Sequence, residues 1–120
     1  MAKLLVHLTA GPHDPTRAAL ALLVARTAAA GGHEVSVFLA GDSVAYLRDP
    51  IMDAAQGIGT GSVREHYTAL AAAGVRVFAS GMSSKARGVD ADATGGKPVE
   101  FAPPDKLVEL IFEADRVVTY

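Results

Sequence analysis

Residues 74–88 read GVRVFASGMSSKARG, and this segment is the most informative part of the chain about its fold. Residues 75–79 form a short, mostly apolar run of the kind found in buried strands, and Gly74 ends the segment before it. From Ser80 onwards, small and polar residues predict a tight turn that leads directly into a short helix. A buried strand followed at once by a helix is the unit of α/β proteins, so the same alternation is expected on either side.

The alternation does extend through the whole chain. Further strands are expected at residues 3–9, 34–39 and 116–120, with one extended piece near residues 99–101. Helices are expected at residues 15–30 after the cap Asp14, at 62–73 from a capping box, and at 103–114. We therefore predict a single domain over residues 1–120. It should be a three-layer α/β/α fold with a mostly parallel sheet of about five strands.

Two segments between these elements are less regular. Asp42 or Ser43 can cap a short helix that ends before Pro50. Residues 51–61 end in GIGTG and are predicted to form a mobile surface loop. We do not read the glycines as a dinucleotide fingerprint, because no convincing strand precedes them.

The composition excludes several classes of function. The chain has 120 residues, no cysteine and a formal net charge of −2. It therefore cannot form disulfides, bind metals through thiolates or carry a persulfide of its own. It offers no broad basic field for nucleic acid or anionic lipid, and its apolar runs are too short to span a bilayer. Residues 1–7 predict a strand rather than a secretory signal. We expect a cytoplasmic protein with no cofactor and no metal.

The stretch after Ser80 is also the first candidate site, because ligands of parallel α/β sheets bind beyond the carboxyl ends of the strands. Gly81 would permit a close turn, and Ser83 or Ser84 would cap the helix. The helix also brings positive charge beside free backbone N–H groups, which favours a small anion. The basic residues are Lys85 and Arg87. The alternative is an ordinary capped surface helix with two solvated basic residues.

The loops after the first two strands contribute acidic residues. Asp14 and Asp42 are expected to line the side of the site opposite the basic residues. A hydrolytic cluster of His13, Asp14 and Ser80 is a further alternative. Because no GxSxG turn surrounds Ser80 and no base is placed beside it, we predict no catalytic residue.

Four segments, taken in order, resemble the DsrE/DsrF-like sulfur-relay family. They are the opening strand with its following helix, residues 32–42 (GHEVSVFLAGD), residues 74–88, and residues 114–120 (ADRVVTY). The resemblance implies a five-stranded α/β sheet and homo- or hetero-oligomers, often trimers or hexamers. In sulfur-carrying members, a cysteine after the third strand holds a persulfide, and Ser80 stands at the matching position here. A hydroxyl cannot carry a persulfide, so the resemblance does not extend to that chemistry.

We therefore expect a non-catalytic, homo-oligomeric protein, a trimer or a hexamer, that binds a small anion or a protein partner around Ser80. One alternative is a structural subunit that pairs with a cysteine-bearing, DsrE-like relative in a sulfur-relay complex. A hydrolytic enzyme that uses His13 and Ser80 is the third hypothesis.

Overall fold

The computed structural model describes residues 1–120 and has a five-stranded sheet at its centre, in the order β6-β5-β2-β1-β7. Every pair of neighbouring strands in this sheet runs parallel. The prediction of a mostly parallel sheet of about five strands is confirmed. The strands are β1 (Lys3–Leu8), β2 (Glu34–Leu39), β5 (Arg76–Ser80), β6 (Glu100–Ala102) and β7 (Arg116–Thr119).

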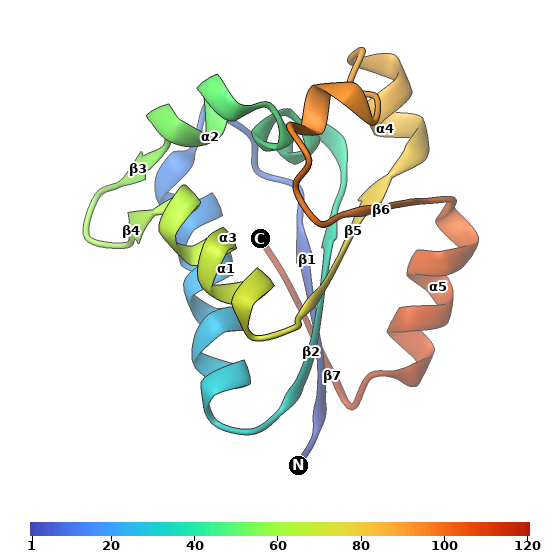
Figure 1. Ribbon diagram of the computed structural model, residues 1–120. Helices are drawn as coiled ribbons and strands as arrows, with labels where there is room; N and C mark the ends of the chain where they lie inside the picture. Colours follow the sequence, from blue (N-terminus) through green and yellow to red (C-terminus); the bar gives the residue numbers. More distant parts are fainter.

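Helices cover both faces of this sheet. Figure 1 shows α1 and α3 on one side and α5 on the other, with α4 at the carboxyl ends of the strands. The α-helices are α1 (Pro15–Ala30), α2 (Asp49–Ala54), α3 (Val63–Ala72), α4 (Gly81–Ala86) and α5 (Pro104–Glu113). Two 3₁₀ helices complete the chain, η1 (Gly41–Leu47) and η2 (Asp92–Thr94). None of these helices has the length and apolar character that crossing a bilayer requires.

Helix α1 begins and ends where its sequence predicts. The Asp14 carboxylate accepts a hydrogen bond from the backbone N–H of Arg17 at 3.1 Å, and Pro15 occupies the first turn. Gly32 follows the helix with φ +87°, a left-handed conformation that glycine adopts without strain. The inner side of α1 is rich in alanine, and Ala18, Ala19, Ala21 and Ala25 are fully buried. These small side chains let the helix pack closely against the sheet and α3.

A second, smaller core lies between the sheet and α5. Phe38 of β2 and Phe78 of β5 stack with ring centroids 6.3 Å apart, and Leu5 of β1 lies in the same cluster. Leu110 of α5 covers this cluster and is also buried. The α5 face of the sheet is therefore sealed by one helix alone, whereas two helices cover the opposite face (Figure 1).

The prediction of a mobile loop over residues 51–61 is wrong. The segment forms the end of α2 and a small hairpin of β3 (Gln56–Gly57) and β4 (Gly61–Ser62). Long-range bonds fix the hairpin, because the backbone N–H of Ile58 donates to the Thr16 hydroxyl at 3.0 Å. The His66 ring also contacts the carbonyl oxygen of Thr60 at 2.7 Å. The sequence of the segment itself does not indicate that Thr16 of α1 and His66 of α3 are its hydrogen-bond partners.

The short helix expected to end before Pro50 is present as η1, which ends at Leu47. Pro50 lies in the first turn of α2, a position that tolerates proline because its missing N–H has no helical acceptor there. Neither Asp42 nor Ser43 caps η1, which follows Ala40 without a side-chain cap. The Ser43 hydroxyl instead donates to the carbonyl oxygen of Leu8 at 2.7 Å.

His7 gives the fold a dependence on pH. It lies two residues after Leu5 and on the same face of β1, its ring meets Phe38 edge-on, and its Nε2 is buried without a partner. Burial lowers the pKa of His7 from 6.5, because the folded protein disfavours the charged ring. The stability that the neutral ring contributes is present above pH 6.5 and is lost as the pH falls through the folded pKa.

We expect thermal unfolding between pH 7 and pH 5 to show this loss, and His7→Leu to flatten it. The exposed His13 supplies a matched control, so His13→Leu should keep the wild-type slope. An unchanged slope in His7→Leu would show that His7 does not cause the effect.

Candidate functional site

The carboxyl ends of β1, β2 and β5 bring three loops together, as the sequence predicts for a parallel sheet. The loops are residues 9–14 after β1, the first turn of η1 after β2, and α4 after β5. In Figure 1 they lie along the upper edge of the sheet, with α4 beside η1. We call this region the C-terminal edge.

Ser80 joins β5 to α4. It is the last residue of the strand, and its hydroxyl accepts a hydrogen bond from the backbone N–H of Ser83 at 3.1 Å, which makes it the cap of α4. The expectation that Ser83 or Ser84 caps this helix is therefore wrong. The Ser83 hydroxyl instead accepts from the backbone N–H of Gly41 at 2.9 Å and so ties α4 to η1. Ser84 is buried, and its hydroxyl has no partner.

Gly81 is not needed for a close turn at this point. It is the first residue of α4 and is not among the glycines with positive φ. The nearest atom to a Cβ built on it would be the carbonyl oxygen of Ala102 at 3.6 Å, an ordinary contact. Another small residue would therefore fit this position.

Asp42 and Arg87 are in direct contact and do not face each other across a site. The Arg87 guanidinium donates to Oδ1 of Asp42 from Nη2 at 2.9 Å and from Nε at 3.2 Å. Its Nη1 donates to the carbonyl oxygen of Ser83 at 3.1 Å. The side chains of Arg87 and Asp42 are 36% and 57% exposed. Arg87 therefore presents a matched ion pair to solvent rather than a free positive charge.

The remaining predicted residues take no part in this ion pair. Lys85 is exposed on α4 and forms no ion pair. The Asp14 carboxylate caps α1 by accepting from the backbone N–H of Arg17, and it also lies 3.3 Å from Nε of Arg17. No hydrogen bond joins His13 to Ser80, whose hydroxyl is engaged with the Ser83 amide. No group of three His, Asp or Glu side chains is arranged to hold a metal ion.

Sequence reasoning missed a buried lysine that supports the C-terminal edge. The side chain of Lys97 is only 5% exposed, and its ammonium group donates to Leu47 O at 3.0 Å and to Thr94 O at 3.1 Å. It also contacts the Asp49 carboxylate. This clamp ties the loop that follows α4 to the end of η1 and the start of α2. Hydrogen bonds from Arg64 and then Lys97 hold the pKa of Asp49 below its ordinary value.

Sequence reasoning also missed an exposed apolar residue on α4. Met82 is 69% exposed and follows Gly81 on the same helix that carries Lys85. The C-terminal edge therefore combines a flexible apolar side chain with the Asp42–Arg87 ion pair.

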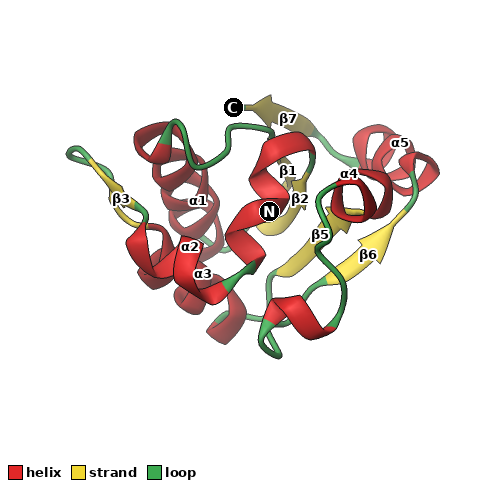
Figure 2. Cartoon of the chain, turned by 90° about the horizontal axis from the view of Figure 1, so that it is seen from above, coloured by secondary structure: helices red, strands yellow, loops and turns green.

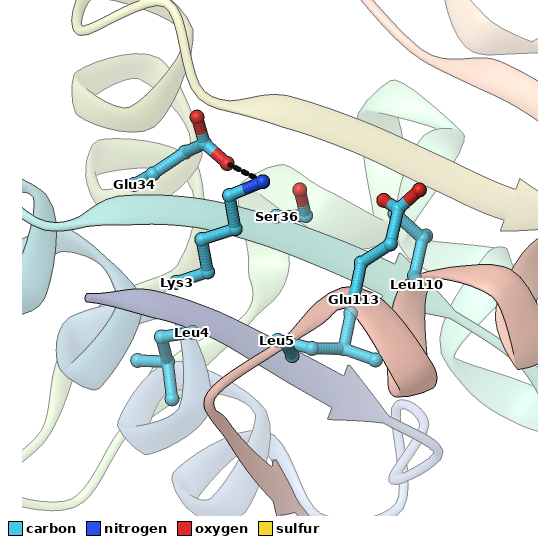
Figure 3. Close-up of a pocket in the computed structure, with 8 residues that line it drawn as sticks. Lys3, Leu4, Leu5, Glu34, Ser36, Leu110 and Glu113 are labelled. Carbon is cyan, nitrogen blue, oxygen red and sulfur yellow. Dashed lines mark ion pairs between the residues drawn. The ribbon is translucent and has the colours of Figure 1, made fainter.

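A small cavity lies far from these residues, at the opposite end of the strands. It is formed between α5 and the first residues of β1 and β2, and Figure 3 shows Lys3, Glu34, Ser36 and Glu113 around it. Its volume of about 30 Å³ is room for one water molecule, and Lys3 pairs with Glu34 across it at 3.6 Å. This cavity is too small to bind a substrate.

A larger apolar hollow lies beside the first loop of the C-terminal edge. Its volume is about 270 Å³, and its lining includes Pro12, Pro15, Tyr46 and Ile51. The Tyr46 hydroxyl donates to the carbonyl oxygen of Gly11 at 2.7 Å, and burial raises the pKa of Tyr46 to about 12. Tyr46 is thus a neutral structural contact that fixes the loop.

Comparison with known proteins gives a consistent result. A family model described as the DsrE/DsrF-like family matches residues 2–120. The crystal structure of the ychN protein from E. coli superposes with a TM-score of 0.78 at 23% identity, over 100% of both chains. A conserved protein of unknown function from Bacteroides thetaiotaomicron superposes with a TM-score of 0.73 at 15% identity, over 99% of this chain and 95% of its own. These structures share the fold. No curated protein matches the sequence.

Proposed function

The chain belongs to the DsrE/DsrF-like family, and from this premise we propose that it is a non-catalytic, oligomeric subunit that binds a protein partner at its C-terminal edge. It has no cysteine, so any sulfur chemistry in its complex belongs to another chain. Ser80 keeps the position after β5, but its hydroxyl caps α4 and meets no base. The geometry therefore supports binding rather than hydrolysis.

One observation carries this proposal: Met82 is 69% exposed on the helix that ends beside the Asp42–Arg87 ion pair. Methionine and arginine are enriched in protein interfaces, because one side chain adapts its shape and the other donates several hydrogen bonds. A small anion would have to compete with Asp42 for Arg87, whereas a protein can cover the ion pair intact. Partner binding therefore fits this edge better than anion binding.

A small anion remains the second candidate, because Lys85 is exposed and has no acidic partner. We also propose that the chain forms homo-oligomers, a trimer or a hexamer. A further alternative is a structural role beside a cysteine-bearing, DsrE-like relative. Native mass spectrometry of the protein purified from its own host separates a protein partner from a small anion. A mixed oligomer that contains a cysteine-bearing relative supports partner binding or the structural role beside that relative, and a homo-oligomer with added small-molecule mass supports anion binding.

Met82→Glu should weaken binding to a cysteine-bearing relative from the same host by about tenfold, because it places a charge in the apolar part of the contact. Isothermal titration measures the change. Ile58→Glu is the matched control, since Ile58 is 88% exposed on the β3–β4 hairpin, away from α4. Equal affinities for the wild type and Met82→Glu would rule out α4 as the partner surface.

A further inference from the structure

The sulfur atoms of the chain all belong to its three methionines, because it has no cysteine. The three side chains differ sharply in exposure. Met52 of α2 is 1% exposed, whereas Met82 of α4 is 69% exposed and Met1 is 99% exposed. An oxidant in solution can therefore reach the sulfur of Met82 in the folded domain but is kept away from that of Met52.

Met82 lies on the side of α4 that faces solvent. Lys85 and Ala86, three and four residues further along the helix, are exposed with it, whereas Ser84 is buried. Figure 2 looks onto the C-terminal edge from above, and no other helix is drawn over α4. Met82 belongs to neither apolar core. Its sulfur is therefore open to solvent without any local unfolding.

Lys85 gives this position a second chemical feature. It shares the outer side of α4 with Met82 at a spacing of three residues, and it forms no ion pair. An ammonium group without an acidic partner is free to donate a hydrogen bond to an oxygen atom on the neighbouring sulfur. Lys85 can thus stabilise an oxidised form of Met82.

We propose that Met82 is a modification site of the C-terminal edge, where a hydroperoxide oxidises it to methionine sulfoxide. The sulfur donates an electron pair to the terminal oxygen of the peroxide, so that an S–O bond forms and the O–O bond breaks. Sulfur is oxidised by two electrons, and the peroxide is reduced. The leaving oxygen takes the proton of the transferred oxygen and departs as an alcohol, or as water when the oxidant is hydrogen peroxide.

The modification changes the surface that we propose for the protein partner, and this consequence rests on that proposal. The thioether of Met82 is apolar and adapts its shape, which suits a protein contact. The sulfoxide is polar, so the partner would have to cover an oxygen that water and Lys85 solvate in the free chain. Oxidation should therefore release the partner, and reduction by a methionine sulfoxide reductase should restore binding.

Peptide mass spectrometry of the purified protein, sampled over time in dilute hydrogen peroxide, tests the modification site. Met82 should gain one oxygen at nearly the rate of Met1, and Met52 should react at least about tenfold more slowly, because accessibility governs the reaction. Met82→Leu, which preserves an apolar side chain of similar size, should leave Met1 as the one fast reaction. Oxidation of Met82 as slow as that of Met52 would overturn the inference.

Isothermal titration with a cysteine-bearing relative from the same host tests the consequence. The chain is oxidised alone and freed of peroxide before the titration, so that the cysteine of the relative stays reduced. The oxidised wild type should bind about tenfold more weakly than the untreated protein, whereas Met82→Leu should bind equally well before and after treatment. An equal loss of affinity in both proteins would show that oxidation of Met82 does not control binding.

These two measurements separate the inference from the proposed function. If the untreated wild type does not bind the relative, the partner proposal fails, while the mass spectra still decide whether Met82 is a modification site. If the wild type binds with the same affinity before and after oxidation of Met82, the partner proposal stands and control by oxidation is overturned.

Discussion

Replacing Lys97 with methionine should lower the free energy of unfolding by about 3 kcal/mol, the largest effect that we expect from a single substitution. The methionine keeps most of the length of the side chain but loses every hydrogen bond of the ammonium group. Two carbonyl oxygens, of Leu47 and Thr94, would then lose a charged donor in a site where the side chain is 5% exposed. Asp49 limits the loss, because it is half exposed and keeps its bond to Arg64 at 2.8 Å.

Denaturant unfolding measures this effect, and a loss of this size would lower the melting temperature by on the order of 10 °C. Lys85→Met is the matched control, since it removes the same charge from an exposed position that has no ion pair. It should change stability by less than about 0.5 kcal/mol. If both variants unfold at the same denaturant concentration, Lys97 does not clamp the loop after α4.

The regular elements were predictable because their signals are local. Helix α1 begins at Pro15 after the cap Asp14 and ends before two glycines, and the structure keeps all of these features. Strand β2 covers residues 34–39, as its apolar run predicts. A short apolar run between turn residues needs no distant partner to be identified as a strand.

Errors arose where distant contacts decide the conformation. Strand β5 continues to Ser80 because Ser80 pairs with Ala102 of β6, and this extension moves the helix cap from Ser83 to Ser80. The hairpin at residues 56–62 depends on Thr16 and His66. Neither partner can be identified from the sequence of the segment itself.

The sequence predicted which loops would meet, but not which hydrogen bonds their residues would form. Ser80, Ser83, Asp42 and Arg87 do meet at the C-terminal edge, because parallel strands end at the same side of the sheet. The sequence could not show that Arg87 pairs with Asp42, which is 45 residues away. That pairing replaces a free positive charge with a neutral pair, and for this reason we propose a protein rather than an anion as the partner.

The Asp42–Arg87 pair depends in turn on a glycine in the first loop, and Gly11→Ala should show this. A Cβ on Gly11 would overlap the Asp42 side chain at its Cβ and would lie 2.9 Å from the Asp42 carbonyl oxygen. The loop cannot easily move away from Asp42, because the carbonyl oxygen of Gly11 accepts a hydrogen bond from the buried Tyr46 hydroxyl at 2.7 Å. We expect the free energy of unfolding to fall by about 2–3 kcal/mol, as in other overpacked cores.

The same displacement should weaken partner binding, since it moves the acceptor of Arg87. Gly81→Ala is the matched control, because its Cβ has room and alanine favours the helix by up to about 1 kcal/mol. Urea unfolding and isothermal titration on the two variants separate the effects. If Gly11→Ala is as stable as Gly81→Ala, the first loop does not set the position of Asp42. If Gly11→Ala is destabilised but binds the partner normally, the loop supports the fold and the partner contacts α4 without the ion pair.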